Sequence, residues 1–240
     1  MSEKRGGTQP IGMAMERAVL KLRPTKVELP PPPTRDEIVA ATLKWAGLPE
    51  RYAEARFGNW RDTTGTRAAL KAAQRVAEHP ANLVLVGPWG CGKTRLSASI
   101  MAARVERWLD AYPSEIIEDG PEGIVTRPPF ASRFAGVPQL LDAIRRSYEY
   151  NDEPDPLRPL LTAPLLILDD LGREKATDWV LERLYVLIDT RYGERRPTVV
   201  TTNYSLDELA RRDYGAMVSR LTEAGSVVKI SAADQRPGAN

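Results

Sequence analysis

Residues 87–94 constrain the fold of this chain more than any other part of its sequence. They read Gly-Pro-Trp-Gly-Cys-Gly-Lys-Thr, which fits the phosphate-binding pattern G-x-x-x-x-G-K-[ST], and they follow the apolar run 83–86. From Lys93 onward, apolar residues recur at helical spacing, so the loop opens a helix whose N-terminal dipole also favours phosphate. This order of strand, loop and helix predicts a nucleotide-binding α/β domain rather than a Gly-rich turn of an ordinary α/β unit.

The residues of this loop have distinct expected roles. Its glycines permit the positive or cramped backbone angles with which successive N–H groups surround phosphate oxygens. Lys93 is expected to reach the outer phosphates of ATP, and Thr94 to hold Mg²⁺. The expected ATP contacts are Gly87, Pro88, Trp89, Gly90, Cys91, Gly92, Lys93 and Thr94.

Composition limits the kinds of protein that this chain can be. Its 240 residues suffice for one α/β domain with extensions. With 34 Lys and Arg against 32 Asp and Glu, the formal charge is +2, so any DNA contact must come from local patches. The single cysteine, Cys91, excludes an internal disulfide and a multi-cysteine zinc site. No apolar run approaches the ~20 residues that span a bilayer, and we expect a cytoplasmic protein without membrane contact.

The sequence divides into a tail and a larger domain. Residues 1–34 contain the proline run 30–33 and are interpreted as a flexible tail, in which residues 11–22 form a partner-docking helix or are disordered. Residues 35–240 are expected to form the nucleotide-binding domain, with leading helices in 35–80 and the phosphate-loop core in 81–240. Within that core, residues 111–132 are interpreted as a surface insertion, and residues 137–150 as a helix.

Two helices are expected ahead of the phosphate loop. The first starts at residues 34–37, and the second covers residues 67–78. Their expected buried residues are Ile38, Ala41, Leu43 and Trp45 in the first helix and Ala68, Leu70, Ala73 and Val76 in the second. The only histidine, His79, is interpreted as a favourable residue at the end of the second helix rather than a catalyst.

Two acidic residues directly follow a second apolar run, residues 165–168. Four consecutive apolar residues are typical of a strand buried on both faces. Ligands of open α/β sheets bind beyond the carboxyl ends of such strands, so the acidic pair is expected beside the phosphate loop. Asp169 is then the candidate Mg²⁺ partner, and Asp170 the candidate for orienting or deprotonating the attacking water. In isolation, the pair would instead be a solvated strand end before Gly172.

A third run, residues 197–203, is rich in β-branched residues and ends in Asn203. From the neighbouring strand, this amide could hydrogen-bond the γ-phosphate or its attacking water. The local alternative is that Asn203 caps the helix that starts near residues 205–208.

Six ordered segments of the chain resemble a known family. Residues 46–52, 87–94, 165–172, 184–192, 197–203 and 219–221 are similar to the bacterial helicase-loader ATPases of the DnaC/DnaI type, whose AAA+ relatives include the transposition ATPase IstB. The resemblance implies an AAA+ P-loop fold with a central parallel sheet flanked by helices, Mg²⁺-dependent ATP hydrolysis, Asp169 and Asp170 as the acidic pair, and Asn203 as the first sensor.

The resemblance also implies residues that complete the ATP site. Arg220 would be the arginine finger, which reaches the γ-phosphate held by a neighbouring copy of the chain and stabilises the transition state there. Arg236 is positioned like the second sensor, although a solvated arginine near a chain end is the alternative for both residues.

For single-stranded DNA, the resemblance points to an aromatic residue before the acidic strand and to the segment after it. The matching residues are Tyr148, Thr177 and Trp179, accompanied by Arg145, Arg146, Arg173 and Lys175. Aromatic faces stack on unpaired bases, and cations follow the phosphates. Trp179 also fits a helical apolar pattern, so core packing is the alternative for this residue.

The leading hypothesis is a replication factor that assembles on single-stranded DNA and loads a replicative helicase. The alternatives are an IstB-like transposition helper that binds duplex DNA and recruits a transposase, and an adaptor that sequesters the helicase. A P-loop kinase is disfavoured, because Asp169, Asp170, Asn203 and Arg220 suit an activated water better than an acceptor hydroxyl.

Overall fold

The computed structural model of the chain describes residues 33–112, 132–149, 155–223 and 225–232. Almost all of the predicted tail, including the possible docking helix at 11–22, lies outside these residues. The same holds for most of the predicted insertion and for Arg236.

A parallel sheet of five strands forms the centre of the described domain, in the order β2-β3-β4-β1-β5. The strands are β1 (Asn82–Val86), β2 (Arg133–Gly136), β3 (Leu166–Leu171), β4 (Thr198–Thr202) and β5 (Gly225–Lys229). β4 lies between β1 and β3, and its Val200 is opposite both Val84 and Leu168. The carboxyl ends of the three strands that precede the predicted site residues therefore lie side by side. The expected parallel α/β architecture is confirmed.

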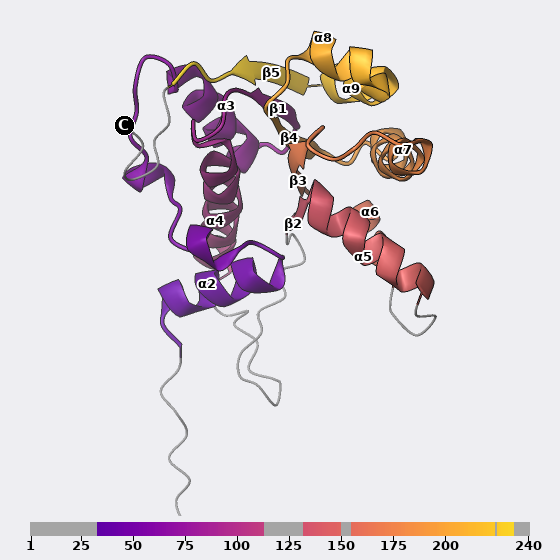
Figure 1. Cartoon of the computed structure of the whole chain (residues 1–240). Helices are drawn as coiled ribbons and strands as arrows, with labels where there is room; N and C mark the ends of the chain where they lie inside the picture. The colour runs from indigo at the N-terminus through magenta and orange to yellow at the C-terminus, as the bar shows by residue number, and fades with distance from the viewer. Residues whose placement is uncertain (1–32, 113–131, 150–154, 224, 233–240) are drawn as a thin grey trace, which may run out of the picture. The chain divides into compact units, whose positions relative to one another are not determined.

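Alternate residues of the strands pack into two cores, one on each face of the sheet. Leu83 and Leu85 of β1 belong to the first core, and Val84 and Val86 to the second. The first core is covered by α2 (Arg35–Trp45), α3 (Arg67–Glu78) and α4 (Lys93–Ala111). The second is covered by α5 (Val137–Glu149), α6 (Arg158–Thr162), α7 (Asp178–Gly193), α8 (Leu206–Leu209) and α9 (Gly215–Glu223). Figure 1 shows these helices on opposite sides of the sheet.

The boundaries of the leading helices match the sequence predictions, but parts of their predicted buried faces are wrong. Thr34 and Glu37 form a reciprocal capping box at the start of α2. Ala41 is nevertheless exposed, because the buried face consists of the i,i+4 pairs Ile38–Thr42 and Val39–Leu43. In α3, Ala68 is exposed for the same reason, since Ala69, Ala72, Ala73, Val76 and Ala77 form the buried stripe.

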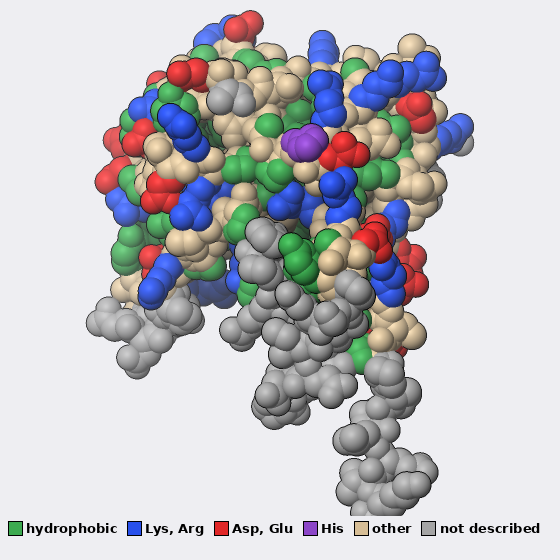
Figure 2. All heavy atoms as spheres, turned by 180° about the vertical axis from the view of Figure 1, so that it is seen from behind, with side chains coloured by type: hydrophobic (Ala, Val, Ile, Leu, Met, Phe, Trp, Pro, Cys, Tyr) green, Lys and Arg blue, Asp and Glu red, His purple; other side chains and the backbone are tan. Residues whose placement is uncertain are grey.

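Other predicted residues lie close to their expected places. Trp45 is half-buried beneath the guanidinium of Arg133, whose Cζ is 3.6 Å from its ring centroid. His79 is the exposed C-terminal cap residue of α3. The view from behind shows it as the purple side chain on a face where charges of both signs are interspersed (Figure 2). This mixture agrees with the formal charge of +2.

Candidate nucleotide site

The phosphate loop joins β1 to α4 through two glycines with positive φ angles. Gly90 has a φ of +76° and Gly92 of +95°, a region that residues with a Cβ rarely adopt. A Cβ on Gly92 would also lie 2.6 Å from the ring of Trp60, a nearly buried side chain in the segment before α3. Two independent constraints therefore require glycine at the N-cap of α4.

Lys93 is held at the centre of the loop by three oxygen atoms. Its Nζ donates hydrogen bonds to the carbonyl oxygens of Gly87 at 2.7 Å and Pro88 at 2.8 Å. It also donates to Oδ1 of Asn203 at 2.8 Å. The ammonium group is thus positioned inside the loop, where the outer phosphates of a nucleotide would be its natural partners.

Asp169 and Asp170 lie at the carboxyl end of β3, as expected, but within the strand, because β3 continues to Leu171, three residues beyond the apolar run. The register against β4 shifts between Leu168 and Leu171, and Asp170 has a φ of +62°. Such an irregularity changes the direction of side chains at the end of a strand. It separates the environments of the two carboxylates: Asp169 is buried, and Asp170 lines the pocket.

Asp169 faces the hydroxyl of Thr94. Thr94 Oγ1 donates to its two carboxylate oxygens at 2.9 and 3.1 Å, and Thr201 Oγ1 donates to Oδ1 at 2.7 Å. Burial raises the pKa of Asp169, and the charge of Asp170 adds to this, whereas the hydroxyls of Thr201 and Thr94 oppose it. A hydroxyl and a carboxylate are oxygen ligands of the kind that Mg²⁺ takes. Thr94 and Asp169 therefore fit this ion.

The described residues contain no group of three or more His, Cys, Asp or Glu side chains that could form a metal cage. Magnesium sites beside phosphates need no such cage, because one or two protein ligands, water and the phosphates complete the coordination. The Thr94–Asp169 pair would suit a site of this second kind.

Asn203 connects the phosphate loop to Asp170. Its Oδ1 accepts from Lys93, and its Nδ2 lies 3.5 Å from Oδ1 of Asp170. The local alternative, that Asn203 caps the next helix, is wrong because Ser205 caps α8 and forms a capping box with Glu208. The amide is therefore available to a ligand between Lys93 and Asp170.

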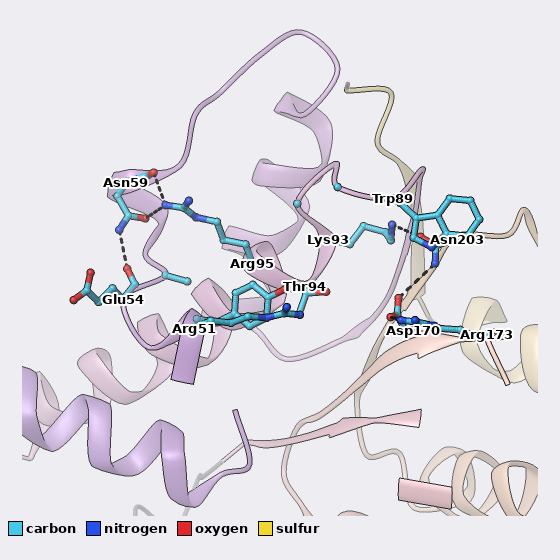
Figure 3. A pocket seen from close by; sticks show the side chains of 14 residues that line it. Arg51, Glu54, Asn59, Trp89, Lys93, Thr94, Arg95, Asp170, Arg173 and Asn203 are labelled. Atoms are coloured by element: carbon cyan, nitrogen blue, oxygen red, sulfur yellow. Dashed lines mark hydrogen bonds and ion pairs between the residues drawn. The ribbon is translucent and has the colours of Figure 1, made fainter. Parts of the chain in front are cut away.

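The pocket around these residues has a volume of about 550 Å³. Figure 3 shows Lys93, Asn203 and Asp170 on one side of it and residues that precede α3 on the other. Arg51 and Tyr52 come from the turn η1 (Glu50–Tyr52), and Asn59 from η2 (Phe57–Asn59). Sequence reasoning gave these residues no role in the site. For Arg51 and Tyr52, the resemblance of residues 46–52 to the loader family was a signal.

Thr201 and Arg173 are further residues that sequence reasoning did not assign to the nucleotide site. Besides donating to Asp169, Thr201 Oγ1 accepts from the backbone N–H of Asp170 at 3.0 Å, so one hydroxyl holds the carboxylate of Asp169 and the backbone of Asp170. Nη1 of Arg173 lies 3.3 Å from Oδ2 of Asp170. Arg173, which was expected to follow DNA phosphates, therefore lies in the nucleotide pocket.

The remaining loop residues differ in exposure. The side chain of Trp89 is 64% exposed at the mouth of the pocket, whereas Cys91 is fully buried. The sulfur of Cys91 lies 3.8 Å from Nζ of Lys93.

Arg220 lies on α9 and is not among the residues that line the pocket. It forms an ion pair with Asp189 and donates to the hydroxyl of Tyr185 at 2.6 Å. Its Cζ lies 4.8 Å from the ring centroid of Tyr185 and 5.8 Å from that of Tyr192. The hydrogen bond to Asp189 raises the pKa of Arg220, so the side chain is charged.

Three of the residues expected to contact DNA, Tyr148, Arg145 and Trp179, form a surface cluster on α5 and α7. Tyr148 is 60% exposed and meets Trp179 edge to face, with ring centroids 6.5 Å apart. Cζ of Arg145 lies 5.1 Å from the Trp179 centroid. Trp179 also packs against the second core, so the two interpretations of this residue are compatible. Thr177 caps α7 by accepting from the N–H of Val180 at 3.4 Å.

Arg146 is exposed on the same helix as Tyr148.

Within the part of the chain that the structure describes, no helix has the length and apolar character needed to cross a bilayer.

Comparisons with known proteins agree with this geometry. No protein-family model matches the chain. The replicative helicase loader DnaI of Bacillus subtilis (strain 168) is 28% identical over 128 residues, which cover 53% of this chain and 34% of DnaI. An insertion-sequence IS232 protein of Bacillus thuringiensis subsp. berliner is 28% identical over 161 residues, 65% of this chain and 56% of that protein. The chain thus matches a third to about half of the length of these relatives.

The fold is also found among solved structures. The crystal structure of the DnaC helicase loader superposes with a TM-score of 0.62 at 24% identity, and the match covers 76% of this chain and all of that chain. Similarity at this level of identity shows the fold alone. Together with the sequence relatives, it confirms that the chain has the AAA+ P-loop fold and resembles the helicase-loader and IstB-type ATPases.

Proposed function

We propose that the chain is an ATP-hydrolysing replication factor that assembles on single-stranded DNA and helps to load a replicative helicase. The observation that carries the ATPase part is the convergence of Lys93, Thr94, Asp169, Asp170 and Asn203 on one pocket at the carboxyl edge of the sheet. Helicase loading is supported by the similarity to DnaI and to the DnaC fold.

Each pocket residue has a separate role in the proposed hydrolysis of ATP. Lys93 binds the outer phosphate oxygens, and Thr94 and Asp169 hold Mg²⁺, which supplies positive charge to the phosphates when bound. Asp170 orients the attacking water and accepts its proton, because its carboxylate lines the pocket and Asp169 is committed to the threonine hydroxyls. Asn203 links Asp170 to Lys93, and thereby fixes the position of the attacking water relative to the phosphate.

Arg220 completes the site of a neighbouring subunit in this proposal. Arg220 lies outside the pocket of its own subunit, which supports action in trans. In a neighbouring subunit's pocket, its positive charge would stabilise the phosphoryl group during transfer. ATP binding then favours assembly and hydrolysis favours release. Arg236 lies outside the described residues, and its second-sensor role remains a prediction from resemblance.

Mixing two inactive variants tests the trans arrangement. Lys93→Ala removes the phosphate contact but keeps the finger, and Arg220→Ala does the opposite. Each variant alone is expected to lose ATPase activity, and an equal mixture should recover part of it, because about one interface in four pairs an intact loop with an intact finger. A mixture that stays as inactive as its components would exclude the shared site, whereas full activity of Arg220→Ala alone would exclude the finger.

DNA binding is assigned to the cluster of Tyr148, Trp179 and Arg145. Its exposed aromatic edge and adjacent cation suit stacking on unpaired bases. Tyr148→Ala should weaken binding to a single-stranded oligonucleotide, measured by fluorescence anisotropy. Tyr112→Ala serves as the matched control, since Tyr112 is an exposed tyrosine at the end of α4. Equal affinities of both variants would remove the cluster from the DNA site.

An IstB-like transposition helper is the second candidate. The insertion-sequence relative aligns over 65% of this chain, more than the 53% that DnaI covers. Pull-down from the native cell extract with ATP and single-stranded DNA distinguishes the two: a replicative helicase is expected. Recovery of a transposase without a helicase, together with preference for duplex DNA, would establish the second candidate instead.

A further inference from the structure

Three arginines line the nucleotide pocket, and two of them are engaged. Nη2 of Arg95 donates to the backbone oxygen and to Oδ1 of Asn59, both at 3.0 Å. Arg173 pairs with Asp170 at 3.3 Å. Within the described residues, the guanidinium of Arg51 makes no hydrogen bond or ion pair, and only the ring of Tyr52 contacts it, with Cζ 4.6 Å from the centroid. Among the described residues, Arg51 is therefore the pocket arginine whose five donors are all unused.

The position of Arg51 is defined by a second, adjoining cavity of about 440 Å³. The residues common to the two cavities are Arg51, Tyr52, Asp170 and Arg173. In the proposed mechanism, Asp170 lies where the attacking water meets the terminal phosphate. Because Arg51 and Asp170 both line the junction of the two cavities, we place Arg51 at the terminal-phosphate end of the pocket. In Figure 3 its side chain runs along the pocket toward Thr94.

The backbone that carries Arg51 is anchored on both sides. Leu48 and Ala55 are buried in the first core. Between them, the N–H of Tyr52 donates to the oxygen of Pro49 at 2.9 Å, which closes the short turn η1. The Tyr52 ring under the guanidinium further limits its motion. Less conformational entropy is lost when such a side chain binds a ligand.

The charges of the site leave a need for another cation. Asp169 and Asp170 add two negative charges to those of a triphosphate, and a bound Mg²⁺ would offset two charges in all. Lys93 is the cation of the loop, Arg173 is paired with Asp170, and Arg95 is bonded to Asn59. A guanidinium offers two parallel donors to phosphate oxygens and stays charged in proteins. We propose that Arg51 binds the terminal phosphate of ATP within its own subunit, and thereby makes the pocket discriminate ATP from ADP before a neighbouring Arg220 arrives. This inference rests on the proposed function and specifies how its site selects the triphosphate.

Nucleotide affinity measured on dilute, unassembled protein tests this role. A non-hydrolysable ATP analogue and ADP, each with Mg²⁺, are titrated into wild type, Arg51→Ala, Arg51→Lys and Arg75→Ala. The last variant is a charge-matched control, since Arg75 is exposed on α3 away from the pocket. Arg51→Ala should weaken the ATP analogue about 10- to 100-fold, as expected for lost bonds to a charged group, and leave ADP affinity within about twofold. Arg51→Lys should recover part of the loss, and Arg75→Ala should match wild type.

Two results would overturn the inference: an unchanged affinity of Arg51→Ala for both nucleotides, or an equal loss for both. Lys93→Ala separates this failure from failure of the proposed function. If Lys93→Ala binds both nucleotides as wild type does, the nucleotide site itself is wrong. If Lys93→Ala loses both and Arg51→Ala keeps the wild-type ratio, only the role of Arg51 is wrong.

Discussion

Arg191 provides the sharpest stability prediction, because it is a fully buried guanidinium bound to neutral oxygens. It donates to Leu160 O at 2.6 Å, Ala163 O at 2.9 Å, Pro197 O at 2.6 Å and Thr198 Oγ1 at 3.0 Å. These bonds join α7 to the end of α6 and to the start of β4. Burial lowers the pKa of Arg191 to about 10, so the group is still charged at neutral pH.

Arg191→Met should cost about 2–4 kcal/mol of the free energy of unfolding. The oxygens of Leu160 and Ala163 and the hydroxyl of Thr198 would lose their bond to Arg191, which costs about 6 kcal/mol in total at about 2 kcal/mol each. Pro197 O keeps the N–H of Leu166 at 3.2 Å. Removing the buried charge offsets about 3 kcal/mol of this loss, because burial lowers the pKa of Arg191 to about 10 and so disfavours its charged form.

Urea unfolding followed by circular dichroism measures this loss. The midpoint should fall with the slope unchanged, and Arg191→Lys should lie between Arg191→Met and wild type, because lysine keeps the charge but has fewer donors. Arg75→Met, at an exposed position, should stay within about 0.5 kcal/mol of wild type. If Arg191→Met were as stable as wild type, or more stable, the cost of burying the Arg191 charge would equal or exceed the stabilisation from its hydrogen bonds, and the reasoning would be refuted.

Three further predictions concern the site and a helix cap. Thr201→Val should lower ATP turnover about 10- to 100-fold with nucleotide affinity retained, because Asp169 loses its 2.7 Å donor; an unchanged turnover would contradict this. Gly92→Ala should abolish ATP binding in a titration, since its Cβ meets Trp60, and normal binding would refute the constraint. Hydrogen bonds within the α2 cap lower the pKa of Glu37, so its stabilisation is present at neutral pH and lost as the pH falls through that pKa. Melting temperatures of Glu37→Gln and wild type should therefore converge in acid, and a constant difference would count against the cap.

The sequence predicted the parts of the fold that are encoded locally. The phosphate loop has a fixed spacing, and the apolar runs before Asp169 and Asn203 mark buried parallel strands. Because such strands present their carboxyl ends at one edge, their polar end residues were expected to meet, and Lys93, Asn203 and Asp170 do lie together.

The parts that were missed depend on contacts between distant segments. Arg51 lies more than 35 residues before the loop whose pocket it lines, and no periodicity or motif links the two. Thr201 is one of several threonines in β4, and its role depends on the register shift in β3. The buried face of α2 was misjudged at Ala41 because a short helix with scattered apolar residues fits more than one face.

The division of the interior into two cores makes the two halves of the proposed shared site separable by mutation. Cys91 and Leu96, from the loop and α4, pack in the first core, whereas Met217 and Leu221, from the helix of Arg220, pack in the second. Effects of distant, independent substitutions on stability are nearly additive. Truncating Met217 should therefore loosen the helix that carries Arg220 while Cys91 and Leu96 keep their packing, so its effect on the nucleotide side would pass through the strand residues Val86 and Leu168, which share the second core.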